Sequence, residues 1–266
     1  MIAGGLALAV ASAVAIAGGY ALQHSSASRL PPLTLRRPVQ SLMLLVRSGP
    51  WLVGFLAGIG GWVLYVVALR LAPLSLVQAA SAGGIGVLAI GTRPNRAERF
   101  GVVAALGGLV LLALSVGSHP PTGQGTVLGV VLWVALSAAV AAGLAARPSA
   151  ATLGTAAGIL YASGDVATKA AVLGGARLAF APVVLACHGA AFLCMQLAFQ
   201  RGGRLASAGL AVLWTNALPI AAGTALFSEA LPGGVRGVLR VLAFALVLAG
   251  AVALSRREAG PVPLTD

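Results

Sequence analysis

The sequence predicts an all-α membrane protein with nine transmembrane helices. Nine long apolar runs fill most of the 266 residues, and almost every charge lies in the segments between them. The composition agrees, with 59% hydrophobic residues, 8% charged residues and a mean hydropathy of +0.99. Backbone in lipid has to satisfy its own hydrogen bonds, so such runs are helices. We therefore expect a single transmembrane domain over residues 1–266 and no soluble catalytic module.

Each apolar run approaches the roughly 20 residues that a spanning helix needs. The first run is longer than the apolar part of a cleaved signal peptide and lacks its basic start. The longest connection, residues 23–49, contains an apolar segment at 39–47, which predicts an amphipathic helix on the inner leaflet; a disordered linker is the alternative. The predicted spans are residues 2–22, 50–69, 73–91, 100–117, 126–146, 150–172, 178–199, 205–227 and 235–254.

The basic residues predict how the chain crosses the membrane. With nine spans, 12 of the 17 Lys and Arg residues fall in the connections of one side and four in those of the other, and Lys169 lies within a span. Connections rich in Lys and Arg stay cytoplasmic. We expect a plasma membrane protein with an extracytoplasmic N-terminus and a cytoplasmic tail at 256–266. The scattered arginines suit anionic lipid headgroups at the cytoplasmic face, and they do not indicate nucleic acid.

The chain contains an internal repeat. Residues 18–24 match residues 163–169 at a constant offset of 145, and residues 68–70 match 198–200 at an offset of 130. Glu98 and Glu229 correspond at an offset of 131. Spans one to four, within 1–117, therefore pair with spans six to nine, within 150–255, and residues 126–146 form a linking helix. Because the copies are five spans apart, the second is inverted, as in alternating-access transporters.

Five short segments carry a family resemblance: YALQH at 20–24, ALRLAPLSLVQ at 68–78, TKA at 168–170, QLAFQRG at 196–202 and LFSE at 226–229. In this order they resemble the drug/metabolite transporter (DMT) superfamily. Within it, they resemble the nine-span NIPA-like branch more closely than the ten-span EamA branch. The resemblance implies a secondary transporter for a small solute or cation. NIPA relatives are associated with magnesium transport, but this chain has only five acidic residues, and divalent cations usually bind through carboxylates.

Asp165 is the only acid inside a predicted span, and Lys169 is the only lysine of the chain. Their i, i+4 spacing places both on one helix face, in the order that favours an ion pair. Pairing also lowers the cost of placing each charge in lipid. The pair is either a structural lock on the sixth span or a proton-coupling or substrate-coupling site; a third alternative is that Lys169 simply extends to the outer interface.

Other polar groups at membrane depth are candidates to face a cavity. Pro219 interrupts the eighth span and frees a backbone carbonyl beside Asn216. For each candidate alone, a satisfied position in the core is the alternative. The candidate substrate or coupling residues are Asp165, Lys169, Asn216, Gln78, Tyr161, Thr168 and Trp214, and Gln196 and His188 are further polar groups of this kind.

Glu98 and Glu229 lie near predicted helix starts, where a carboxylate caps the positive helix end. A gating ion pair is the alternative for these two. The sequence shows no paired-carboxylate motif, no His-Glu-x-x-His and no Gly-rich phosphate loop. We therefore expect no enzyme, no cofactor and no metal site.

Three functions remain in competition. The leading hypothesis is a secondary transporter that moves a small solute or cation by alternating access. The alternatives are a lipid-carrier flippase and a non-transporting scaffold that packs through Gly/Ala-rich faces; these faces are also compatible with a homodimer. A polar cavity between the repeats favours transport, a lateral groove open to lipid favours a flippase, and a tightly packed interior favours a scaffold.

Overall fold

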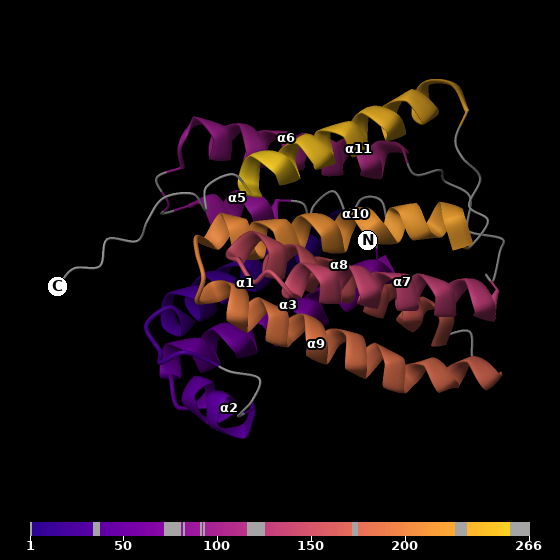
Figure 1. The fold of residues 1–266 in the computed structure, drawn as a ribbon. Helices are drawn as coiled ribbons and strands as arrows, with labels where there is room; N and C mark the ends of the chain where they lie inside the picture. Colours follow the sequence, from indigo (N-terminus) through magenta and orange to yellow (C-terminus); the bar gives the residue numbers. More distant parts are fainter. Residues whose placement is uncertain are drawn as a thin grey trace.

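The computed structural model describes residues 2–33, 38–71, 81, 83–90, 92, 94–115, 126–171, 175–226 and 233–255, and over these residues it contains helices and no strands. The helices run roughly side by side, with α6 and α11 paired at one edge and α9 near the opposite edge (Figure 1). In chain order they are α1 (Ile2–Ala27), α2 (Pro38–Val46), α3 (Gly49–Leu71), α5 (Gly84–Ala89), α6 (Arg96–Ser115), α7 (Val127–Ala145), α8 (Ala150–Ala171), η1 (Gly175–Phe180), α9 (Ala181–Phe199), η2 (Leu205–Gly209), α10 (Leu210–Leu226) and α11 (Gly234–Ser255).

The described helices follow the predicted apolar runs to within a few residues at most ends. The segment predicted at 39–47 forms α2, so the alternative of a disordered linker is wrong, and the chain turns by 93° between α2 and α3. Of the predicted span at 73–91, the structure describes mainly α5, because residues 72–80 and 82 lie outside the described part. That span therefore stays a prediction.

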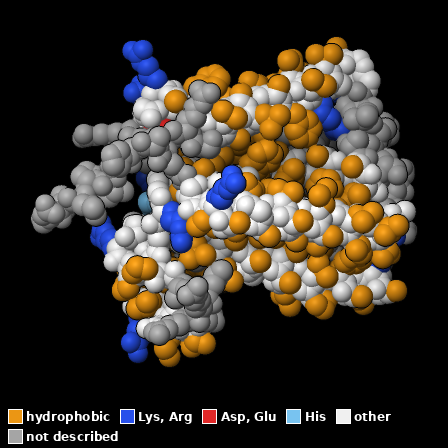
Figure 2. All heavy atoms as spheres, viewed as in Figure 1, with side chains coloured by type: hydrophobic (Ala, Val, Ile, Leu, Met, Phe, Trp, Pro, Cys, Tyr) orange, Lys and Arg blue, Asp and Glu red, His pale blue; other side chains and the backbone are white. Residues whose placement is uncertain are grey.

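Five of the described helical segments are long and apolar enough to cross a membrane, and the bent pair of α2 and α3 provides a sixth if it counts as one span. Large hydrophobic side chains are exposed on several of them, including Leu128 on α7, Leu185 on α9 and Val241 on α11. Figure 2 shows hydrophobic side chains along the flank of the molecule, with most of the visible Lys and Arg at the end where α2 lies. The protein is thus a multi-pass membrane protein, whereas the count of nine spans stays a prediction.

Side-chain caps explain where three helices begin. Asn95 and Glu98 form a reciprocal capping box at the start of α6, since each side chain accepts a hydrogen bond from the backbone N–H of the other at 2.8 Å. Ser149 and Thr152 form the same arrangement before α8. Thr126 accepts from the N–H of Gly129 at the start of α7. Glu98 is therefore a helix cap, as predicted, while Glu229 lies outside the described residues.

Small residues allow the helices to approach closely. A Cβ added to Gly54 on α3 would lie 2.6 Å from the carbonyl oxygen of Gly19 on α1, and a Cβ on Gly108 of α6 would lie 2.9 Å from a carbonyl oxygen of α11. Gly154 on α8 packs in the same way against the backbone of η2. In a membrane, helices associate by such close packing because lipid gives little hydrophobic driving force.

We call α1, α3, α5 and α6 the first half and α8 to α11 the second half, following their order in the chain. Helix α1 packs chiefly on α3, α8 packs on α9 and α10, and α7 packs on α8. The pair of α6 and α11 joins the halves. The buried Arg240 of α11 lies at the C-terminal end of α6. It donates from Nε to the Ser115 hydroxyl (3.2 Å) and from Nη2 to the Ser115 carbonyl (3.3 Å). Its positive charge thus lies at the negative end of the α6 dipole.

Candidate functional site: a cavity between the two halves

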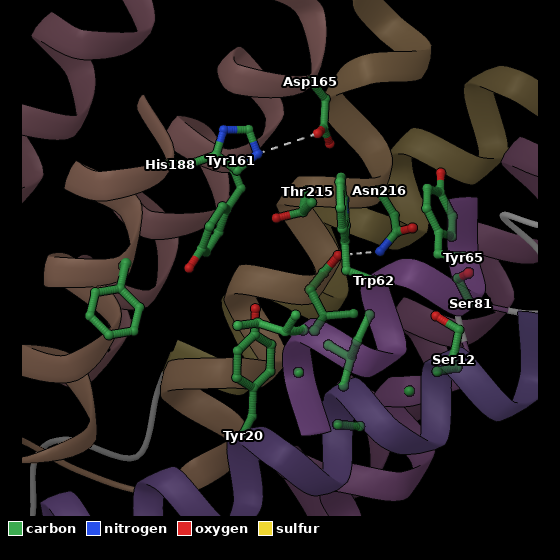
Figure 3. A pocket seen from close by; sticks show the side chains of 18 of the residues that line it. Ser12, Tyr20, Trp62, Tyr65, Ser81, Tyr161, Asp165, His188, Thr215 and Asn216 are labelled. Atoms are coloured by element: carbon green, nitrogen blue, oxygen red, sulfur yellow. Dashed lines mark hydrogen bonds and ion pairs between the residues drawn. The ribbon is translucent and has the colours of Figure 1, made fainter. Parts of the chain in front are cut away.

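A cavity of about 610 Å³ lies between the two halves. Its walls come from α1, α3 and α5 in the first half and from α8, α9 and α10 in the second. Figure 3 shows the side chains of Asp165 and His188 at one end of this cavity and that of Tyr20 at the other. The polar lining includes Ser12, Asp165, Thr168, His188, Thr215 and Asn216.

Aromatic side chains form much of the remaining wall. All three tyrosines of the sequence line the cavity, although they belong to three different helices, α1, α3 and α8. None of the six aromatic side chains in the wall is fully buried. They are Tyr20, Phe55, Trp62, Tyr65, Tyr161 and Phe192.

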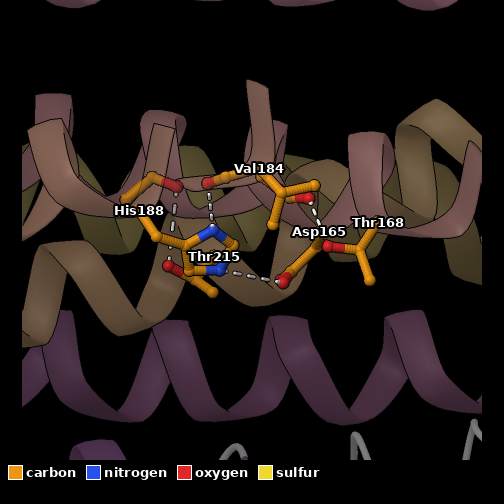
Figure 4. A network of polar contacts seen from close by, with 7 residues as sticks. Asp165, Thr168, Val184, His188 and Thr215 are labelled. Atoms are coloured by element: carbon orange, nitrogen blue, oxygen red, sulfur yellow. Dashed lines mark hydrogen bonds and ion pairs between the residues drawn. The ribbon is translucent and has the colours of Figure 1, made fainter. Parts of the chain in front are cut away.

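Asp165 and His188 form a charged pair across the cavity wall. Oδ1 of Asp165 on α8 lies 3.7 Å from Nε2 of His188 on α9, and Nδ1 of His188 lies 2.9 Å from the carbonyl oxygen of Val184 (Figure 4). The histidine ring rests on Gly164, where a Cβ would overlap the ring. Glycine at 164 therefore makes room for the ring beside Asp165.

The hydrogen bond to Val184 fixes the protonation pattern of this pair. A carbonyl oxygen only accepts, so Nδ1 of His188 carries a hydrogen and donates it. Nε2 faces the Asp165 carboxylate at 3.7 Å, so the two groups attract each other as an ion pair when the ring is protonated, whereas the neutral ring turns a lone pair toward the carboxylate. The pair can thus hold one exchangeable proton, with net charge zero when the proton is bound and minus one when it is absent.

A buried hydrogen-bond network closes the cavity at the end where Tyr20 lies. Gln196 on α9 donates from Nε2 to Oε1 of Gln23 on α1, and it accepts from Nε1 of Trp51 on α3, both at 2.8 Å. All three side chains are at most 3% exposed. The network therefore ties two helices of the first half to one helix of the second.

Gln200 strengthens the same closure one turn further along α9. Its Nε2 lies within hydrogen-bond distance of the carbonyl oxygens of Ala27, Leu30 and Pro31, and its Oε1 accepts from the N–H of Leu33 at 2.8 Å. A single side chain of the second half thereby holds the segment that follows α1. At the other end of the cavity, the side chains of Asp165 and Thr168 are exposed, so the cavity is accessible there.

The structure brings together four of the predicted site residues. Asp165, Tyr161, Thr168 and Asn216 all line the cavity. Thr168 donates to the carbonyl of Gly164, and Asn216 donates to that of Val212, so both are also tied to their own helix.

The other predicted site residues are not among the described residues that line the cavity. Trp214 is not part of the described lining; its Nε1 is buried and has no hydrogen-bond partner among the described residues. Glu98 caps α6. Gln78, Glu229 and the side chain of Lys169 lie outside the described residues, so the predicted pair of Asp165 and Lys169 is not tested.

Sequence analysis missed the aromatic wall and the partner of Asp165. Phe55, Gly58, Trp62 and Tyr65 recur every three or four residues on α3, a spacing that marks one helix face and could have indicated the wall. No local signal links His188 to Asp165, because the two lie on different helices. The network around Gln196 was missed for the same reason.

Comparison with known proteins gives one partial match to report. A stretch of 72 residues is 40% identical to a protein named "Probable magnesium transporter NIPA9" from Arabidopsis thaliana. The stretch covers 27% of this chain and only 20% of that protein. No family model and no solved structure matches the chain.

Proposed function

We propose that this chain is a secondary transporter that moves a small solute or cation across the plasma membrane by alternating access. The observation that carries the proposal is a cavity whose walls come from both halves, closed at one end by hydrogen bonds between the halves and accessible at the end where Asp165 lies. Rocking one half against the other is a way to exchange the closed and the open end. The partial similarity to a magnesium transporter supports transport in general.

Two pairs of matching contacts support the internal repeat, with copies at 1–117 and 150–255 around a linking helix at 126–146; its inversion follows from the displacement by five predicted spans. Gly19 packs against the backbone at Gly58, and its mate at offset 145, Gly164, packs against His188, which is Gly58 plus 130. Gly84 likewise lies against Ala13, and the mates of these two, Trp214 and Gly158, are in contact. The same pair of offsets therefore relates contacts within the first half to contacts within the second.

Asp165 is the proposed coupling residue. A proton on the pair of Asp165 and His188 neutralises the cavity wall, and its loss leaves one negative charge that can bind a cation, so proton and cation exclude one another. The titratable groups facing the cavity are Tyr20 on α1, Tyr65 on α3, Tyr161 on α8 and His188 on α9. Lys169, one turn along α8, is a second proposed partner of Asp165. With the predicted orientation, the closed end faces the cytoplasm and the C-terminus is cytoplasmic.

The competing hypotheses have different structural support. A cavity of this size weakens the case for a closely packed scaffold. A lipid-carrier flippase is the second candidate, because an apolar groove between α6 and α11 is lined by Phe100, Leu248 and Val252, with Arg96 at its rim. The groove carries little polar surface along which a headgroup could cross.

Flux measurements test the proposal. The purified chain, reconstituted in liposomes, is expected to drive accumulation of at least one solute from a panel of Mg²⁺, organic cations, amino acids and nucleosides under an imposed pH gradient. Protein-free liposomes are the control. Correctly folded protein that accumulates none of them, while flipping a fluorescent lipid, would favour the flippase, and protein that does neither would favour the scaffold.

The coupling role has its own test. Asp165→Asn is expected to leave membrane insertion intact and to abolish the dependence of flux on the pH gradient. If Asp165 and Lys169 are merely a structural pair, Asp165→Asn/Lys169→Met restores the activity that the single change loses. Full activity of that double variant contradicts the coupling role.

A further inference from the structure

We infer that the cavity takes a bulky organic monocation, such as a quaternary or tertiary ammonium compound. This inference rests on the proposed transport function and names its substrate class. It departs from Mg²⁺, the ion that the name of the partially similar Arabidopsis thaliana protein gives.

The charges of the lining select for a single positive charge. Among the described lining residues, Asp165 is the only acid, and there is no lysine or arginine. Its carboxylate is about half-exposed to the cavity, so it can contact a ligand. An anionic solute finds no cationic partner among these residues apart from His188, which already faces Asp165.

The described lining offers a divalent ion one carboxylate, which balances only one of its two positive charges. Mg²⁺ binds in octahedral geometry and usually takes one or two carboxylates with several waters. Here the other oxygen ligands are neutral: Ser12, Thr168 and Asn216 donate their hydrogens to the backbone carbonyls of Gly61, Gly164 and Val212 and keep uncharged oxygens. Among the described residues, no group of three His, Cys, Asp or Glu side chains could hold a metal.

The aromatic wall has the chemistry that a large cation needs. Tyrosine and tryptophan attract a cation through the negative face of the ring, and the attraction strengthens when the cation is desolvated. Figure 3 shows Trp62 and Tyr161 between Asp165 and Tyr20, with Tyr65 at the side. The volume of about 610 Å³ is in the range of sites for drug-sized molecules. A ligand whose cationic group lies at Asp165 and whose apolar substituents lie among these rings would contact both the carboxylate and the aromatic wall.

Equilibrium binding to the full chain in detergent micelles tests this inference without requiring transport. The probe is radiolabelled phenyltrimethylammonium, and tert-butylbenzene, its uncharged isostere, is the matched competitor. We expect saturable binding of the cation that the isostere displaces at least about tenfold less well than unlabelled cation, because the isostere lacks the Coulomb attraction to the Asp165 carboxylate. Equal displacement by the neutral compound overturns the inference.

Two pairs of variants locate the site. Asp165→Asn is expected to weaken binding by at least about tenfold, whereas Asp266→Asn, the same change outside the described lining, leaves binding within about twofold. Trp62→Leu is expected to weaken binding by about 2- to 30-fold, whereas Trp133→Leu on α7 does not. Unchanged affinity in both Asp165→Asn and Trp62→Leu overturns the inference.

The outcomes separate the inference from the proposed function. Cation binding without flux of any solute supports the site and contradicts transport. Flux of Mg²⁺ that phenyltrimethylammonium does not inhibit keeps transport and contradicts the organic cation.

Discussion

Replacing Gln196 by leucine removes both hydrogen bonds of the network that closes the cavity. The change leaves the indole N–H of Trp51 and the amide oxygen of Gln23 in surroundings that are at most 3% exposed. Side-chain hydrogen bonds between membrane helices contribute about 0.6 kcal/mol each on average, and buried hydrogen bonds in general about 1 kcal/mol. Loss of two such bonds therefore predicts a decrease of about 1–2 kcal/mol in the free energy of unfolding, measured by circular dichroism in mixed micelles with increasing dodecyl sulfate.

A double-mutant cycle isolates the bond between Trp51 and Gln196. Trp51→Phe removes the indole N–H and keeps an aromatic ring, so together with Gln196→Leu it should cost about 0.6–1 kcal/mol less than the sum of the single changes. The matched control is Trp133→Phe, whose Nε1 has no hydrogen-bond partner among the described residues; its effect should add to that of Gln196→Leu within about 0.3 kcal/mol. Strict additivity of Trp51→Phe with Gln196→Leu would refute the bond as a tie between the halves.

Four further predictions follow from packing, caps and topology. Gly54→Ala should lower the free energy of unfolding by about 1–3 kcal/mol, because its Cβ meets the backbone of α1, whereas Gly60→Ala on the same helix meets nothing and should stabilise by up to about 1 kcal/mol. Arg240→Ala should cost about 1.5–3 kcal/mol, and Arg236→Ala, an exposed neighbour, less than about 0.5 kcal/mol; the same unfolding assay measures both. Asn95→Ala should cost about 0.5–2 kcal/mol by removing the cap of α6; a variant as stable as the wild type contradicts the capping box. Cysteines engineered into residues 28–49 should react with an impermeant thiol reagent from the cytoplasmic side only, and labelling from outside intact cells would reverse the predicted orientation.

Features formed by residues close together in the sequence could be predicted, and contacts between different helices could not. Helix positions were predictable because an apolar run long enough to span lipid has few other structures available, and the segment at 39–47 shows that even a short run was placed correctly. The role of Glu98 was predictable because a cap is formed within four residues. The approach of His188 to Asp165 was not predictable, because the fold brings it to within 3.7 Å from another helix; the i, i+4 pair with Lys169 stays a prediction. All three tyrosines share one cavity for the same non-local reason.

The π-helical turn η2 determines which side chains α10 presents. Five residues, Leu205–Gly209, form this wider turn before α10 begins, and the cavity residues of α10 then follow at 212, 215, 216 and 219, one continuous stripe. Each residue of an α-helix turns by about 100°. A π turn holds one residue more than an α turn, so the same five residues wound as regular α-helix would rotate α10 by about 100° and turn this stripe away from the cavity. The wide turn thus determines the rotation of α10 about its own axis, and with it the helix face that lines the cavity.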